Sequence, residues 1–211
     1  MADVFHRSFF ISGPAGRLEA LLWTVSGDAP RQVGVVCHPH PLFGGTLHNK
    51  VVFRVAKALH DHGLPVLRFN FRGAGLSEGT HDNGRGEYAD VVAALDFLSA
   101  EFPNIAILLA GFSFGALVGL RAGCSDARVH SLIGLGLPVN HSDLNYLRSC
   151  VKPKLLIQGA GDQYGSREKV EEVFKTIAEP KKLVFVDAAD HFFTGKLERV
   201  SAAIGSWLEN D

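Results

Sequence analysis

Residues 107–120 read ILLAGFSFGALVGL, an apolar run interrupted by one serine that has a glycine two positions away on either side. The residues before Gly111 are typical of a buried strand, and those after Gly115 are typical of a buried helix. The turn between them matches G-x-S-x-G, a sharp strand-to-helix turn that displays its serine at the edge of a sheet. We predict that Ser113 is a nucleophile at the amino end of a helix, where helix N–H groups favour developing negative charge. The alternative is a serine that only begins a helix in a glycine-rich turn.

Outward from this stretch, short apolar runs alternate with amphipathic segments. The runs that predict strands are 4–11, 18–25, 33–37, 65–71, 105–110, 131–137, 154–159 and 182–188. Apolar residues three or four positions apart predict helices around 51–59, 88–98, 170–177 and 197–207. Such alternation indicates an α/β fold, with a mostly parallel sheet of about eight strands and helices on both faces. The first two runs have no helix between them and predict an antiparallel hairpin at one sheet edge. We expect one domain over residues 1–211.

Charge and cysteine content bear on the partners and the location to expect. The formal net charge of −1 and the lack of any run of like charge give no reason to expect nucleic acid or an anionic membrane. The uncharged stretch from Ile105 to Leu120 is shorter than the roughly 18 residues of a spanning helix and is rich in glycine. The cysteines Cys37, Cys124 and Cys150 cannot all pair with one another, so we expect reduced thiols and a cytoplasmic location. The first residues do not resemble a secretory signal.

A serine nucleophile needs a neighbouring base, and the base needs an orienting acid. Serines displayed in this type of turn are followed along the chain by the acid and then by the histidine. His191 is the only histidine after Asp162, and each residue lies just beyond a predicted strand. We therefore predict His191 as the base and Asp162 as its partner. Asp143, Asp187 and Asp190 remain alternatives for the acid, although Asp190 is adjacent to the histidine and badly placed to orient it.

The stretch VGVVCHPHPLFGG, residues 33–45, invites a metal interpretation because His38 and His40 are two positions apart. A zinc site needs three or four ligands, and no supporting ligand pattern is present, so we expect no metal and no cofactor. The loop is better interpreted as the source of one backbone N–H that donates to an oxyanion, with the backbone N–H of Phe114 as the other donor. The two prolines of the loop have no N–H, which leaves His40, Leu42, Phe43 or the glycines, and we favour Leu42.

The glycine-rich stretch FNFRGAGLSEG, residues 69–79, follows another predicted strand. It lacks the spacing of the common phosphate-binding loops. We therefore predict a structural turn beside the site, with Arg72 held in a salt bridge.

Five motifs together carry a family resemblance: HPHPLFGGTLHNKVV, NFRGAGLSEG, GFSFG, GAGDQYG and ADHFF. Their order resembles that of the small, lidless α/β-hydrolases of bacteria, which are related to dienelactone hydrolases and have carboxylesterase-like members. The resemblance covers nearly the whole chain and implies an α/β-hydrolase fold, with Ser113, His191 and Asp162 as the catalytic triad. Dienelactone hydrolases have a cysteine where this chain has Ser113, so their substrate is not implied.

Many α/β-hydrolases insert a lid late in the sheet, but the segment from Pro138 to Pro153 has room for one short helix only. A lidless site is open, so we expect a small-molecule substrate, a short-chain or small aryl ester. Candidate substrate-binding residues lie near the predicted triad: His40, Phe43, Phe112, Tyr164 and Phe192. A thioesterase, an amidase or a cofactor-free perhydrolase would use the same triad, and a non-catalytic binding protein is the alternative from another class. The sequence leaves the oligomeric state open, and a homodimer is compatible with it.

Overall fold

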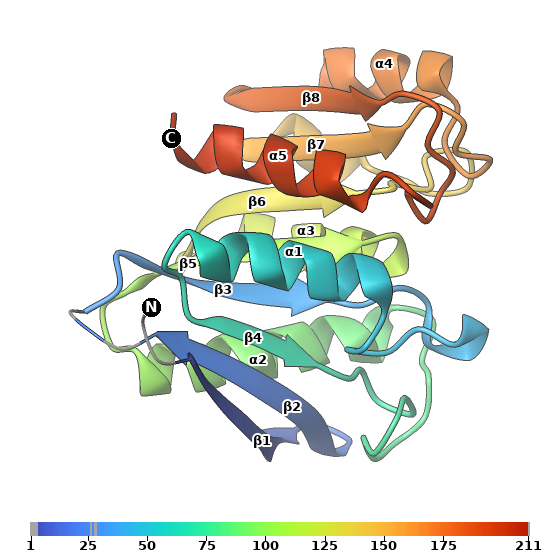
Figure 1. Cartoon of the computed structure of the whole chain (residues 1–211). Coiled ribbons are helices and arrows are strands. Elements are labelled where there is room, and N and C mark those ends of the chain that lie inside the picture. Colours follow the sequence, from blue (N-terminus) through green and yellow to red (C-terminus); the bar gives the residue numbers. More distant parts are fainter. Residues whose placement is uncertain (1–3, 26, 28, 211) are drawn as a thin grey trace.

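The computed structural model describes residues 4–25, 27 and 29–210. In these residues eight strands form one sheet, in the spatial order β1-β2-β4-β3-β5-β6-β7-β8 (Figure 1). The strands are β1 (Val4–Gly13), β2 (Gly16–Val25), β3 (Gln32–Cys37), β4 (Val66–Phe69), β5 (Ala106–Phe112), β6 (Val129–Leu135), β7 (Lys154–Gly159) and β8 (Lys181–Val186). The helices are α1 (Lys50–Asp61), α2 (Arg85–Glu101), α3 (Phe114–Ser125), α4 (Arg167–Thr176) and α5 (Leu197–Leu208), with short 3-10 helices η1 (Pro41–Phe43) and η2 (Asn145–Arg148).

The sheet is parallel except at one edge. Strand β2 pairs antiparallel with both β1 and β4, and the remaining neighbours pair parallel. Gly13 pairs with Gly16, so only two residues turn the hairpin and its strands are longer than predicted. The predicted mostly parallel sheet with an antiparallel edge is confirmed.

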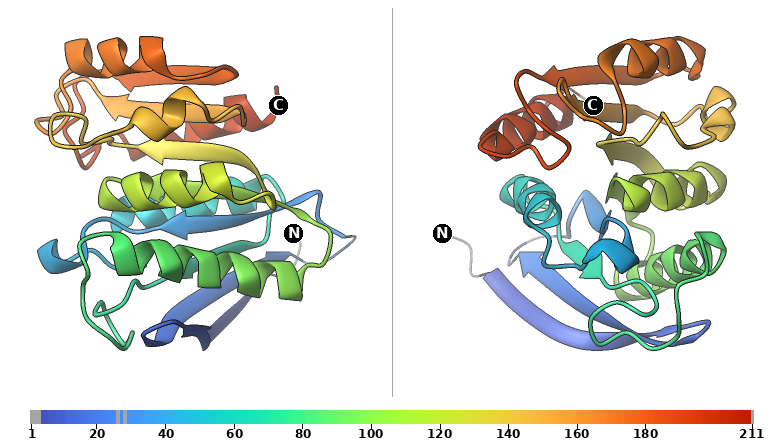
Figure 2. Two further views of the ribbon diagram at one scale, coloured as in Figure 1. Left: turned by 180° about the vertical axis from the view of Figure 1, so that it is seen from behind. Right: turned by 90° about the vertical axis from the view of Figure 1, so that its right-hand side faces the viewer.

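Helices cover both faces of the sheet, as predicted. Helices α1 and α5 lie on one face, and α2, α3 and α4 lie on the other (Figure 2). Two separate hydrophobic cores follow from this layering, because buried strand residues point alternately to either face. In β5, for example, Leu108 packs beneath α1 and α5, whereas Leu109 packs beneath α2 and α3.

The chain turns at the carboxyl ends of the parallel strands, so the loops after β3, β7 and β8 gather along one edge (Figure 1). The loop after β3 is anchored by His38, which is fully buried. Its Nδ1 lies 2.6 Å from the carbonyl oxygen of Pro39, and its Nε2 accepts the backbone N–H of Phe71 at 2.9 Å. These two bonds require the neutral ring with its proton on Nδ1. Burial lowers the pKa of His38 to about 4.

The turn after β4 is structural, as predicted. The guanidinium of Arg72 lies 2.6 Å from a carboxylate oxygen of Asp90 on α2, and both side chains are buried. The same carboxylate accepts the backbone N–H of Arg72 at 3.0 Å. A bidentate pair with this additional bond fixes the turn against α2.

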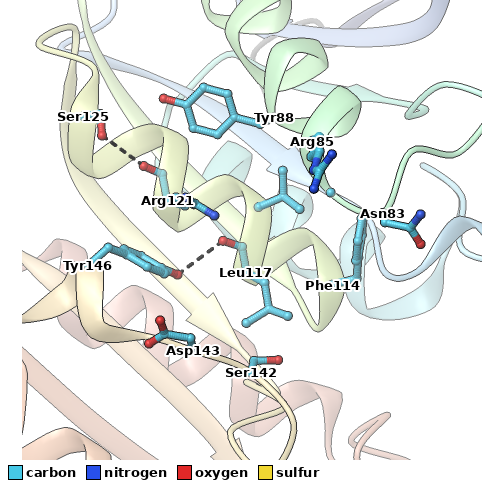
Figure 3. A pocket seen from close by; sticks show the side chains of 12 residues that line it. Asn83, Arg85, Tyr88, Phe114, Leu117, Arg121, Ser125, Ser142, Asp143 and Tyr146 are labelled. Carbon is cyan, nitrogen blue, oxygen red and sulfur yellow. Dashed lines mark hydrogen bonds between the residues drawn. The ribbon is translucent and has the colours of Figure 1, made fainter.

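Between β6 and β7 the described chain contains only η2, so no lid domain is inserted there. This segment lies against α3, where the hydroxyl of Tyr146 donates to the carbonyl oxygen of Leu117 at 3.2 Å (Figure 3). Burial raises the pKa of Tyr146, so the hydroxyl remains a neutral donor. The short connection confirms the prediction of a lidless fold.

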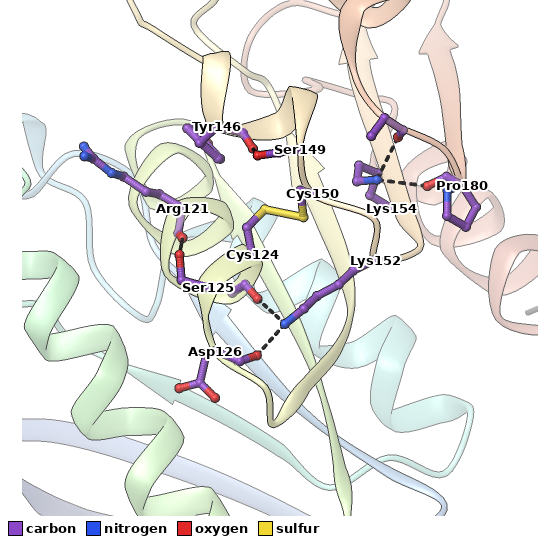
Figure 4. The surroundings of a disulfide bond; sticks show 12 residues. Arg121, Cys124, Ser125, Asp126, Tyr146, Ser149, Cys150, Lys152, Lys154 and Pro180 are labelled. Atoms are coloured by element: carbon purple, nitrogen blue, oxygen red, sulfur yellow. Dashed lines mark hydrogen bonds between the residues drawn. A yellow bond between two sulfur atoms is a disulfide. The ribbon is translucent and has the colours of Figure 1, made fainter.

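A disulfide joins Cys124, at the end of α3, to Cys150, just after η2 (Figure 4). The two Cα atoms are 5.5 Å apart, within the range that a disulfide spans. The expectation of three reduced thiols is therefore wrong for this pair. Only Cys37 is a free thiol among the described residues, and it is buried. The disulfide weakens the cysteine argument for a cytoplasmic location, and that location stays a prediction. No helix of the described chain has the length and apolar character needed to cross a membrane.

Breaking the disulfide is expected to destabilise the fold. The bond closes a loop with a sequence separation of 26 residues, for which the chain-entropy model gives about 3 kcal/mol of stability. Reduction should lower the melting temperature of the wild-type protein, and a Cys124→Ser, Cys150→Ser double variant should not respond to reductant. Titration of the denatured, unreduced protein should find one thiol. Three thiols would contradict the pairing and restore the expectation of a reducing location.

Acid is expected to destabilise the protein through His38. Because burial lowers its pKa to about 4 in the folded state, the unfolded chain binds the extra proton between about pH 6.5 and pH 4. The stabilising contribution of the neutral ring is complete above that window and is lost as the pH falls through it. The loss should be on the order of 3 kcal/mol. Urea unfolding at several pH values should show a flatter dependence for His38→Gln than for the wild type. The exposed-site control His130→Gln should keep the wild-type slope, and equal slopes in all three proteins would contradict the assignment.

Candidate active site

Ser113 lies at the tip of the turn between β5 and α3, as predicted. Its backbone has φ 56° and ψ −119°, a conformation that residues with a side chain rarely adopt. Hydrogen bonds hold it there: its N–H donates to the carbonyl of Leu135 at 2.9 Å, and its own carbonyl accepts the N–H of Ala116 at 2.9 Å. These bonds to strand β6 and to the first turn of α3 hold the backbone of Ser113 in its unfavourable conformation.

The two glycines of the motif are required by close backbone approach. A Cβ at Gly115 would lie 2.4 Å from the carbonyl oxygens of both Cys37 and His38, at the end of β3. A Cβ at Gly111 would lie 2.4 Å from the carbonyl oxygen of Gly115. Real Cβ atoms do not approach this closely, so a side chain at either position would push α3 away from the sheet.

Three side chains that are distant in the sequence meet at this edge. Nε2 of His191 lies 2.9 Å from the hydroxyl oxygen of Ser113, and Nδ1 of His191 lies 2.8 Å from Oδ2 of Asp162. His191 and Asp162 are 3% and 4% exposed, which shields both bonds from solvent. A carboxylate partner accepts a hydrogen bond from Nδ1–H, which leaves Nε2 unprotonated and able to accept the serine proton. The arrangement can therefore remove the proton from the hydroxyl.

The carboxylate of Asp162 has two further partners. Its Oδ1 accepts the backbone N–H of Tyr164 at 2.8 Å, and its Oδ2 also accepts from Nε2 of Gln158 at 2.8 Å. The amide oxygen of Gln158 in turn accepts the N–H of Leu137 at 2.9 Å. Sequence reasoning did not identify Gln158, although it is the one uncharged polar residue in the apolar run KLLIQG.

The other aspartates considered as the acid have different partners. Asp143 accepts the backbone N–H of Asn145, and Asp187 is an exposed partner of Arg167. Asp190 accepts both the backbone N–H and the hydroxyl of Thr194. None of the three makes a hydrogen bond to His191 within the described chain.

The serine and the histidine open into a pocket of about 340 Å³, which we call the catalytic pocket. Four of the five predicted substrate-binding residues line it: His40, Phe43, Tyr164 and Phe192. Phe112 does not line it. That ring is fully buried and packs 5.0 Å from the ring of His191, centre to centre, so it supports the imidazole from behind.

The structure also corrects the prediction for Leu42. Its side chain is 68% exposed and does not line the catalytic pocket, and its N–H donates to Nδ1 of His40 at 3.3 Å. The amides of Phe43, Gly44 and Gly45 bond to carbonyl oxygens of their own loop. Within residues 39–45, the N–H of His40 is the one backbone N–H that makes no hydrogen bond in the described chain.

Sequence reasoning also missed a buried pair behind His40. Nδ1 of His81 lies 2.9 Å from a carboxylate oxygen of Glu87, and the His81 ring packs 4.8 Å from that of His40. Burial opposes ionisation of Glu87, but backbone N–H groups of Asp82 and Gly84 bond to the carboxylate and hold its pKa below the ordinary value. The available signal was a glutamate three residues after the N-cap Gly84, where its carboxylate can accept the N-cap backbone N–H.

Burial also lowers the pKa of His40, and the neighbouring His81 acts in the same direction. Among the described residues no group of three or more His, Cys, Asp or Glu side chains has the arrangement of a metal site. His38 and His40 lie close in sequence but have separate partners, Phe71 for the first and Leu42 for the second.

Comparisons with known proteins agree with this geometry. A family model described as an alpha/beta hydrolase domain matches residues 43–201. An uncharacterised protein of Rickettsia prowazekii is 37% identical over an alignment of 209 residues that covers 94% of this chain and 87% of that protein.

Two solved structures are similar over nearly the whole chain. An alpha-beta serine hydrolase homologue from Coxiella burnetii has 39% identity and a TM-score of 0.90, with 96% of this chain and 97% of that one covered. A serine hydrolase without a lid from Xanthomonas campestris has 32% identity and a TM-score of 0.89, with 97% and 94% covered. The family model spans the turn at Ser113 and the loops of Asp162 and His191, and the chain belongs to the alpha/beta hydrolase family.

Proposed function

We propose that the protein is a serine carboxylesterase that hydrolyses short-chain or small aryl esters through an acyl-enzyme intermediate. The observation that carries the proposal is the continuous chain of hydrogen bonds from Asp162 through His191 to Ser113. Its hydroxyl end opens into the catalytic pocket, where an ester carbonyl can approach it. Similarity to proteins described as serine hydrolases supports the same chemistry.

In the first half of the reaction, Oγ of Ser113 attacks the ester carbonyl while Nε2 of His191 takes its proton. Asp162 keeps the imidazole in the required tautomer and stabilises the imidazolium that forms. The proton then passes to the leaving alcohol. In the second half, His191 activates a water that releases the acid and restores the serine.

The negative charge of the tetrahedral intermediate is stabilised by hydrogen-bond donors that are in position before the substrate binds. The backbone N–H of Phe114, in the first turn of α3, makes no hydrogen bond in the described chain and directly follows Ser113. We assign the second donor to the N–H of His40 in place of Leu42, because the N–H of Leu42 and those of the three residues after it already donate within the loop. The bonds of His38 to Pro39 and Phe71 hold this loop in position before substrate arrives.

The shape of the catalytic pocket supports small acyl groups. Its volume of about 340 Å³ is bordered by the partly exposed rings of Phe43, Tyr164 and Phe192. Aromatic walls favour an apolar acyl or aryl group, and an open pocket encloses a long chain only in part. Hydrolysis of p-nitrophenyl esters should therefore be fastest for the shortest acyl groups.

Ser113→Ala should abolish covalent labelling by a fluorophosphonate probe and lower kcat for p-nitrophenyl acetate by about four orders of magnitude or more. The assay should include a thioester, an amide and peroxide as an acceptor, because these separate the esterase from the thioesterase, amidase and perhydrolase alternatives. Labelling or turnover that persists in Ser113→Ala would refute the assignment of the nucleophile. Absence of both in the wild-type protein would favour a binding protein.

Asp162→Asn should lower kcat for p-nitrophenyl acetate by about 10⁴-fold, because an amide favours the wrong tautomer of His191. Asp143→Asn and Asp187→Asn are matched controls, since these exposed carboxylates make no bond to the histidine. Both controls should retain wild-type kcat. A large loss in either control together with an active Asp162→Asn variant would reassign the acid.

A further inference from the structure

A second pocket, of about 740 Å³, adjoins the catalytic pocket. The two pockets share Phe114, Leu117 and Ser142 in their walls, so they meet directly beside the nucleophile turn. The second pocket lies between the start of α2, the exposed side of α3 and the segment that holds η2 (Figure 3). The proposed hydrolysis makes no use of it.

Two arginines from different helices line this pocket. Arg85 is the first residue of α2, and Arg121 lies near the end of α3. In Figure 3, Arg121 lies between Tyr88 and Tyr146, and Arg85 lies beyond Tyr88, on the side of Phe114. Neither guanidinium makes an ion pair within the described chain, although most of the other arginines do.

The acidic residues nearest to these arginines along α2 and α3 are bound elsewhere. Their partners are His81 for Glu87, Arg72 for Asp90 and Arg128 for Asp126. One acid, Asp143, lines the pocket, and its Oδ1 accepts the backbone N–H of Asn145 at 2.8 Å. Two arginines against one aspartate leave the pocket wall with an excess of positive charge.

We propose that this pocket, which we call the arginine pocket, binds an anionic arm of the ester substrate, a carboxylate or phosphate group held by Arg85 and Arg121. The proposal rests on the proposed esterase function and narrows its substrate class to esters that carry such an arm. Guanidinium groups match carboxylate and phosphate oxygens in both charge and geometry. The shared wall formed by Phe114 and Leu117 lets one molecule occupy both pockets, with its carbonyl at Ser113.

The first test compares two p-nitrophenyl esters of equal acyl length, the hemiglutarate and the pentanoate. The wild type should prefer the hemiglutarate. An Arg85→Gln, Arg121→Gln double variant should lose about tenfold in kcat/KM for the hemiglutarate through KM, equivalent to about 1.4 kcal/mol, and should keep its activity on the pentanoate. Arg148→Gln is the matched control, because Arg148 is an exposed arginine of η2 outside the pocket. Added salt should reduce the preference.

The ester can carry its charge on the acyl side or on the alcohol side, and a second pair of esters separates these cases. The pair is 4-acetoxybenzoate and its neutral methyl ester, which place the charge on the leaving group. An arginine-dependent preference in either pair supports the proposal and identifies the side. Hydrolysis of all four esters with no such preference in either pair overturns it.

A binding measurement keeps the proposal separate from the proposed catalysis. Calorimetry with Ser113→Ala should show that glutarate binds more tightly than pentanoate and that replacing both arginines by glutamine removes the difference. If the wild type hydrolyses none of the esters, the esterase function fails while this measurement still decides the arginine pocket. Equal binding of glutarate and pentanoate, with no arginine-dependent preference in either ester pair, would overturn the pocket assignment and leave the proposed hydrolysis unaffected.

Discussion

The architecture of the site depends on how closely α3 approaches the end of β3. Gly115 lies so near the carbonyls of Cys37 and His38 that no side chain fits between them. This contact allows the backbone at Ser113 to hold a φ of 56° and raises the hydroxyl above the carboxyl edge of the sheet. It also places the first amide of α3 beside the loop after β3, so the proposed nucleophile and the proposed oxyanion donors depend on the same packing contact.

Histidine and aspartate reach the same edge for a topological reason. Parallel strands end on one side of a sheet, and β7 and β8 are neighbours that pair over their whole length. Asp162 and His191 follow these two strands and so face each other across a short gap. The buried amide of Gln158 then fixes the carboxylate from below. Burial of all three side chains strengthens these bonds and limits alternative orientations.

Much of this was readable from the sequence because it follows local rules. Strand and helix periodicity predicted the order of the elements, and G-x-S-x-G predicted the turn at Ser113. Asp162 was preferred to Asp143, Asp187 and Asp190 because it follows a predicted strand directly and because the family resemblance implies it, and the hydrogen bond to His191 is consistent with this choice. Such inferences need only neighbouring residues and the known geometry of parallel sheets.

The features that the sequence did not predict depend on which distant residues come together in the fold, or on the direction in which a single group points. Cys124 and Cys150 come together only because the segment after β6 folds back on α3. The prediction for Leu42 depended on the direction of its backbone N–H, and the prediction for Phe112 depended on the face of the sheet on which its ring lies.

The packing of the segment after β6 against α3 also has a consequence for the proposed turnover. This segment is fastened to α3 by the Tyr146 hydroxyl and by a disulfide, so it is held in place beside the pocket and does not act as a movable gate over Ser113. Under the proposed esterase function, a substrate would therefore reach Ser113 without displacing this segment.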